Sequence, residues 1–312
     1  MRIQTLKNEC VFRCYWLGWK LLSLLPYPLT YRLMMLFADV YTRSGKQPEQ
    51  LRKNLSRVVG PENVTRSLVR NSMRSYMRYW LEVFCLQKVV SDEGFYENYA
   101  ASIQGIAHLD AAIERGGGVI LALPHSGNWD LAGAWLAHRY GRFSTVAERL
   151  KPEKLYEAFV DFRQGLGVDV IPSKGASKPP LELLEDVLDT GGVVCLLADR
   201  DLGGHGVPVD FFGERTTMPA GVAVLAERTG ATLLGVHSAY EGPGSANGWV
   251  TRVSAPIIAD SVAGRVEQLA TWFERCIADY PEDWHVLQPF WIADRKRKQG
   301  RSESRHRMSV FL

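Results

Sequence analysis

The chain has 312 residues, 46% of them hydrophobic, and a net charge of +3, so it can bury a large core and lacks the composition of a disordered protein. Its five cysteines form no CxxC pair and no zinc-type spacing with histidine, which excludes the common structural zinc sites and predicts no metal. The charge is uneven: residues 1–90 carry 15 Lys/Arg against 5 Asp/Glu, residues 91–294 carry 15 against 28, and residues 295–312 carry 7 against 1. Basic ends predict an anionic partner, either a membrane surface or a nucleic acid.

The aromatic stretch 8–41 favours the membrane. Basic residues interrupt it and a proline pair breaks it, and no run of about 18 uncharged apolar residues occurs, so a transmembrane helix is not expected. Two short amphipathic helices lying in the plane of an anionic membrane surface fit this pattern, although the same aromatics could instead pack on the body of the protein. We therefore expect residues 1–90 to form an amphipathic helical, membrane-associating region packed on the core, and 295–312 a basic, disordered tail.

A helix is expected over 69–85, with Arg70, Arg74 and Arg78 spaced four apart on one face. Such a basic stripe is usually a solvated surface. Its interleaved aromatics also allow contact with a lipid headgroup or phosphate.

The middle of the chain alternates strands and helices. Strands are expected at 119–123, 143–148, 168–172, 192–198 and 231–240, separated by helices at 130–140, 154–167, 181–192 and 220–230 and followed by one at 266–284. Alternation with short glycine-containing connections predicts an α/β fold, a mostly parallel central sheet flanked by helices, over residues 91–294.

Polar residues follow three of these strands: His125, Glu148 and Asp199. Ligands bind such sheets at the carboxyl ends of the strands. If the three strands are neighbours, the histidine and the two carboxylates meet at one edge of the sheet.

His125 and Asp130 form an HxxxxD pair at the junction of a strand and a helix. A rigid imidazole can take a proton from a hydroxyl, and a carboxylate on its other nitrogen fixes the tautomer. Asp130 could equally be a first-turn helix acid, with Ser126 or Asn128 as the cap. Because no GxSxG elbow, P-loop, GxGxxG or HExxH occurs, a histidine base points to direct attack by a substrate hydroxyl.

Four blocks of the sequence resemble the bacterial lipid A (lauroyl/myristoyl) acyltransferase family, and especially its actinobacterial branch, the phosphatidylinositol mannoside acyltransferases. These blocks are HSGNWD (125–130), the segments 147–172 and 198–221, and YPEDWHVLQPFW (280–291). The resemblance implies a glycerolipid-acyltransferase type sheet. It also implies transfer of a fatty acyl chain from acyl-CoA, a co-substrate with no further cofactor, to a mannose hydroxyl of phosphatidylinositol mannoside at the cytoplasmic face of the cell membrane.

The resemblance also assigns site residues. It makes His125 the general base and leaves Asp130 and Asp199 competing to orient it. Substrate contacts are then expected from Asn128, Trp129, Glu148, Arg163, Arg200 and Asp201, with the two arginines facing phosphates. The oxyanion would be met by backbone N–H groups of residues 127–129 or by Arg163.

Three other functions stay open. A lipid A type acyltransferase would take its chain from an acyl carrier protein, although the acidic body disfavours docking an acidic carrier. A non-catalytic peripheral lipid-binding protein could retain the fold. A nucleic-acid binder is the most remote of the three, and no nucleic-acid partner is expected.

Overall fold

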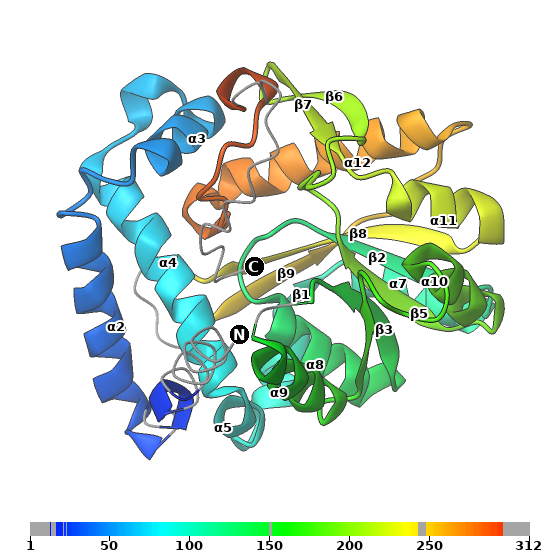
Figure 1. Ribbon diagram of the computed structural model, residues 1–312, viewed down its shortest axis with the longest axis horizontal. Coiled ribbons are helices and arrows are strands. Elements are labelled where there is room, and N and C mark those ends of the chain that lie inside the picture. The colour runs from blue at the N-terminus through cyan, green and yellow to red at the C-terminus, as the bar shows by residue number, and fades with distance from the viewer. Residues whose placement is uncertain are drawn as a thin grey trace, which may run out of the picture.

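The computed structural model describes residues 13, 17–20, 22, 24–149, 152–242 and 248–295 (Figure 1). Its helices are α2 (Tyr27–Tyr41), α3 (Glu49–Val59), α4 (Arg66–Phe84), α5 (Leu86–Val90), α6 (Phe95–Ala101), α7 (Ile106–Arg115), α8 (Trp129–Tyr140), α9 (Glu153–Gln164), α10 (Pro180–Asp189), α11 (Gly221–Thr229) and α12 (Val262–Asp279), with short 3-10 turns η1 (Pro61–Asn63), η2 (Pro281–Asp283) and η3 (Ile292–Asp294). Its strands are β1 (Ile103–Gln104), β2 (Val119–Leu123), β3 (Phe143–Ala147), β4 (Val168–Pro172), β5 (Val193–Leu197), β6 (Val207–Phe211), β7 (Glu214–Met218), β8 (Thr232–Tyr240) and β9 (Trp249–Val253). Residues 1–12 and 296–312 lie outside the described residues, and the second of these ranges is all of the expected tail except Arg295.

Seven strands form the central sheet, in the order β1-β9-β8-β2-β5-β3-β4. Only the β8–β9 pairing is antiparallel, so the expected mostly parallel α/β sheet is confirmed. The order also makes β2, β5 and β3 consecutive neighbours. The three strand ends that carry the predicted polar residues therefore do lie side by side.

Sequence patterns missed the hairpin of β6 and β7. Its two-residue turn is Phe212-Gly213, with φ of +51° and +75°, the left-handed values that a tight hairpin turn requires. The strand β9 was also missed, because five residues of mixed polarity give little periodic signal.

Helices cover both faces of the sheet. The buried residues of α10, α11 and α12 pack on one face together with Ile120 and Ala122, and those of α6, α7 and α8 pack on the other with Val119, Leu121 and Leu123. All five residues of β2 are buried, as expected for a parallel strand covered on both sides. This rigid strand carries the start of the candidate site.

Helices α2, α3 and α4 lie beside the sheet, at the left of Figure 1, and share a third apolar cluster with α9. Of the expected basic stripe on α4, only Arg78 is buried. Arg78 is 3% exposed and donates from Nε to Glu82 at 2.8 Å, and Arg74 pairs with Asp39 on α2. Arg70 and Arg74 stay partly exposed, so the end of α4 that carries Arg78 is the part buried beside the site.

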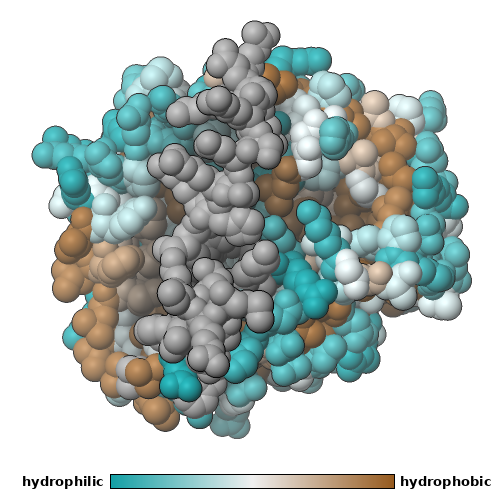
Figure 2. All heavy atoms as spheres, in the orientation of Figure 1, coloured by the Kyte–Doolittle hydropathy of each residue, from teal (hydrophilic) through white to brown (hydrophobic). Residues whose placement is uncertain are grey.

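Helix α2 leaves an apolar face in solvent. Its exposed large hydrophobic residues are Leu29, Leu33, Leu36, Phe37, Val40 and Tyr41. Figure 2 shows this face as the brown strip along the left edge of the molecule. Among the described residues, no helix is both long and apolar enough to cross a bilayer.

Candidate active site

The loop between β2 and α8 carries HSGNWD and is held at both ends. Asn128 caps α8 by accepting the backbone N–H of Leu131 on its side-chain oxygen at 3.0 Å. Gly127 has φ of +59°, and a Cβ there would lie 2.4 Å from the carbonyl oxygen of Ser238, so only glycine fits. Its N–H donates to the carbonyl oxygen of Asp283 at 3.0 Å. The loop is therefore wedged between β8 and the segment that follows α12.

Asp199 holds the imidazole of His125. It lies just beyond β5, next to the end of β2, and its Oδ1 is 2.5 Å from His125 Nδ1. Its Oδ2 accepts the backbone N–H of His125 and the indole N–H of Trp284, each at 3.1 Å. Burial alone would raise the pKa of Asp199, but these partners hold it below its ordinary value of 3.8. With Nδ1 fixed in this way, Nε2 is the nitrogen that can accept a proton from a substrate.

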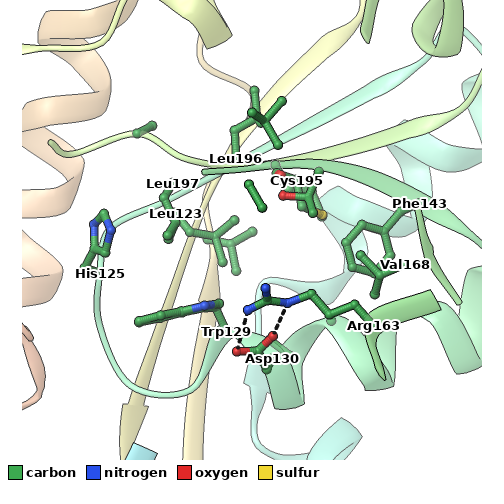
Figure 3. Close-up of a pocket in the computed structure, with 18 of the residues that line it drawn as sticks. Leu123, His125, Trp129, Asp130, Phe143, Arg163, Val168, Cys195, Leu196 and Leu197 are labelled. Carbon is green, nitrogen blue, oxygen red and sulfur yellow. Dashed lines mark hydrogen bonds and ion pairs between the residues drawn. The ribbon is translucent and has the colours of Figure 1, made fainter. Parts of the chain in front are cut away.

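Asp130 does not contact His125. Its Oδ1 accepts from Arg163 Nε on α9 at 3.0 Å (Figure 3). Its Oδ2 accepts from the hydroxyl of Tyr79 on α4 at 3.0 Å. Burial and the nearby Asp130 raise the pKa of Tyr79 well above 10, so it stays a donor. Asp130 thus ties α8 to α4 and α9. Its place in the first turn of α8 agrees with the alternative prediction of a first-turn helix acid.

The remaining predicted contacts divide into two groups. Trp129, Glu148, Arg163 and Arg200 line the same cavity as His125. Asn128 and Asp201 do not, because Asn128 also donates to Glu82 at 2.7 Å and Asp201 accepts the backbone N–H groups of Gly204 and Gly206. Those two side chains shape loops of the fold.

The cavity has a volume of about 800 Å³ and mainly apolar walls. In Figure 3, His125 and Trp129 lie toward one side and the apolar side chains of Leu123, Leu196 and Leu197 lie beside them. Phe143 and Val168 line it farther in, next to Arg163. This arrangement places a basic nitrogen at an apolar space that can hold a long hydrocarbon chain.

Sequence reasoning missed three side chains of the site: Tyr79, Trp284 and His285. Tyr79 lies on the helix that was interpreted as a basic stripe. Trp284 and His285 occur within the quoted block 280–291, whose DWH run was the available signal, but nothing local shows that Trp284 reaches Asp199. His285 lines the cavity and donates its backbone N–H to the carbonyl oxygen of His125 at 2.7 Å.

The fold and the site define an acyltransferase: the chain belongs to the bacterial lipid A biosynthesis acyltransferase family, whose profile it matches over residues 5–292. Two curated relatives are named phosphatidylinositol mannoside acyltransferase. The protein from Mycolicibacterium smegmatis is 48% identical over 90% of this chain and 91% of its own length. The protein from Mycobacterium tuberculosis H37Rv is 47% identical over 90% of this chain and 88% of its own length.

Proposed function

We propose that this protein transfers a fatty acyl chain from acyl-CoA to a mannose hydroxyl of phosphatidylinositol mannoside. The observation that carries the proposal is the His125–Asp199 pair at the apolar cavity. The names of the two mycobacterial relatives support the acceptor. The donor is inferred from the chemistry: an activated acyl group and a chain that the cavity can enclose.

In this mechanism His125 Nε2 takes the proton of the mannose hydroxyl as its oxygen attacks the thioester carbonyl carbon. Asp199 keeps the proton on Nδ1 and stabilises the imidazolium that forms. The tetrahedral intermediate then collapses, the C–S bond breaks, and the thiolate leaves with the proton held by the imidazolium. An ester and a free thiol result, and the histidine is regenerated.

The negative charge that develops on the carbonyl oxygen needs hydrogen-bond donors. The N–H of Gly127 is engaged by the carbonyl oxygen of Asp283. We therefore assign the oxyanion to the first turn of α8, where the positive end of the helix dipole lies, or to the guanidinium of Arg163 at the cavity wall. Glu148 and Arg200 would meet the polar parts of the substrates.

We further propose that the protein works at the cytoplasmic face of the cell membrane, with the apolar face of α2 in the lipid interface. An apolar helix face this exposed is unusual for a protein in water alone. A Leu36→Asp/Val40→Asp variant should lose flotation with anionic vesicles of phosphatidylinositol and phosphatidylethanolamine. Ile258→Asp, at an equally exposed residue beyond β9, is the matched control and should float like the parent. Equal flotation of all three would remove α2 from the interface.

The function is tested by incubating the purified protein with radiolabelled palmitoyl-CoA and phosphatidylinositol mannoside. His125→Ala should lower transfer by about 10²-fold or more, with folding and vesicle binding intact. His108→Ala, at an exposed residue of α7, is the control and should transfer normally. Transfer only from an acyl carrier protein would show that the protein uses the same donor as a lipid A type acyltransferase. Lipid binding without transfer from either donor would mark a non-catalytic protein.

A further inference from the structure

Two hydrogen-bond donors in the cavity wall have no acceptor in the described part of the chain. The guanidinium of Arg163 uses Nε and Nη2 on the carboxylate of Asp130, and its third nitrogen, Nη1, has no partner among the described residues. The indole Nε1 of Trp129 has none there either, whereas the indoles of Trp284 and Trp291 each donate to a protein oxygen. An indole nitrogen can only donate, so Nε1 is available for an acceptor oxygen.

Both nitrogens are open to the cavity. Trp129 and Arg163 line it, and neither nitrogen is among the buried, unpaired polar atoms of the described residues. The side chain of Arg163 keeps 23% of its surface accessible. In Figure 3, Nη1 points away from Asp130 into the cavity, and the nitrogen edge of the Trp129 indole is turned toward the guanidinium. The two donors therefore face a common part of the cavity.

Packing fixes the orientation of both groups before a substrate binds. The ring of Trp129 packs against that of Tyr79, with the centroids 4.2 Å apart, and meets the ring of His125 edge-on at 5.7 Å. The hydroxyl of Tyr79 also donates to Asp130, the carboxylate that holds Arg163. One tyrosine thus supports both donors, and the indole lies next to the proposed base.

Arg163 brings a positive charge to these mainly apolar walls. Burial alone would lower the pKa of its guanidinium, but Asp130 and the nearby Tyr79 raise it above its ordinary value. A guanidinium has five N–H groups, and those of Nη1 remain when Asp130 has taken the other two nitrogens. Hydrogen bonds from a charged donor are strongest to an acceptor that is itself charged, above all where little water is present. The unused donor therefore favours an oxygen that gains negative charge.

We propose that Trp129 is a catalytic residue whose indole N–H, together with Nη1 of Arg163, binds the carbonyl oxygen of the thioester as that oxygen becomes negative. The reaction is that of the proposed function, on which the role of Trp129 rests. The guanidinium, joined by an indole, then takes the place of the first turn of α8 as the oxyanion site.

The electrons and the proton balance around this pair of donors. The oxygen of the sugar hydroxyl bonds to the carbonyl carbon, its proton goes to Nε2 of His125, and the π electrons of the carbonyl move to the oxygen held by the two donors. Those electrons return to form the ester carbonyl as the C–S bond breaks. The departing thiolate takes the proton from the imidazolium.

The kinetic test removes the indole N–H and keeps the aromatic packing. Trp129→Phe should lower kcat for transfer from palmitoyl-CoA about 10²-fold, the loss typical of one oxyanion donor, and change the KM values little. Benzothienylalanine at position 129, which has sulfur in place of the N–H and otherwise the shape of tryptophan, should give the same loss. Trp272→Phe, at a half-buried indole of α12 outside the described lining of the cavity, is the matched control and should keep the kcat of the parent.

A binding test reports on the two donors without turnover. Hexadecylphosphonate has a long chain and a tetrahedral anionic head, so it resembles the intermediate in charge and shape. It should inhibit transfer, and ¹H–¹⁵N NMR should show the indole proton of Trp129 moving to a higher chemical shift, as expected for a hydrogen bond to an anionic oxygen. That signal is assigned by its absence in Trp129→Phe, and the signal of Trp272 should stay in place.

The role of Trp129 is overturned if either replacement at position 129 folds and keeps the kcat of the parent. A rise in KM alone would overturn it too, because the N–H would then bind the ground state as well as the transition state. Hexadecylphosphonate that fails to bind, or that binds without moving the Trp129 signal, has the same consequence. If the wild-type protein transfers no acyl group, the proposed function fails instead, and the phosphonate titration still tests the two donors by themselves.

Discussion

Two carboxylates flank the same loop and have different partners. Asp199 is fully buried and binds the ring and backbone of His125, at the edge of the sheet. Asp130 is 8% exposed and binds a guanidinium and a phenol from two other helices. Asp199 thus contacts the ring whose Nε2 is proposed to react. Asp130, on α8, instead joins that helix to α4 and α9.

The difference shows that spacing along the chain is a poor guide to which acid holds a histidine. Asp130 is five residues from His125 yet pairs elsewhere, and Asp199 is 74 residues away yet lies within 2.5 Å of the ring. Adjacent parallel strands bring residues beyond their ends together regardless of separation in sequence. The HxxxxD pattern therefore combines a proposed base with an acid that pairs with Arg163 and Tyr79 instead of with that base.

The largest effect on kcat is expected from Asp199→Asn. His125 N–H and Trp284 N–H require an acceptor at the Oδ2 position, so the amide NH₂ would face Nδ1 and place the ring proton on Nε2. A protonated Nε2 cannot accept a proton, and we expect kcat to fall by about 10²- to 10⁴-fold. Steady-state assays alongside thermal unfolding measure it. Near-normal kcat in the folded variant would remove Asp199 from the mechanism.

Asp130→Asn should show the opposite profile. It leaves Arg163 without its charged partner, so the free energy of unfolding should fall by about 1–3 kcal/mol, whereas kcat should fall less than tenfold. Arg163→Lys loses the two-pronged geometry and should fall between the wild-type protein and Asp130→Asn in stability. Urea unfolding of the three proteins gives the ranking. A loss of kcat in Asp130→Asn as large as that in Asp199→Asn would contradict the division of roles.

The smallest expected effect is on the pH dependence of the free energy of unfolding, to which Asp199 and Asp283 contribute differently. Burial lowers the pKa of His237 and His285 to about 3, so the stability they contribute is present above pH 6.5 and is lost as pH falls. The raised pKa of Asp283, about 7, acts in the opposite sense: its contribution is present at low pH and lost as pH rises through 7. The lowered pKa of Asp199 matters only below about pH 4.

Between pH 5 and 6, unfolding should therefore take up about one net proton, a slope of about 1.4 kcal/mol per pH unit with lower stability at lower pH. Asp283→Asn removes the opposing contribution and should bring the slope to about 2.7 kcal/mol per pH unit. Asp199→Asn should leave it unchanged. Chemical unfolding at the two pH values measures all three, and equal slopes for wild-type and Asp283→Asn proteins would show that Asp283 is already ionised in the fold.

The sequence alone predicted five of the strands, β2, β3, β4, β5 and β8, together with most of the helices and the place of the site. The apolar runs at β2 and β5 and the break at His125 are local patterns, and local patterns are what a linear sequence displays. It also placed His125, Glu148 and Asp199 after strands that prove to be neighbours. The family resemblance, carried by four blocks, gave the acyltransferase class.

Only the tertiary structure decided how those side chains pair. Three contacts join segments far apart in sequence: that of Asp199 with His125, that of the Trp284 indole with the same carboxylate, and that of Arg78 with the carbonyl oxygen of Gly248. A stripe of arginines has the same spacing whether it faces water or a buried glutamate. Strand order and helix docking are set by the packing of the whole core, so the partners of a buried polar group are fixed only when the chain has folded.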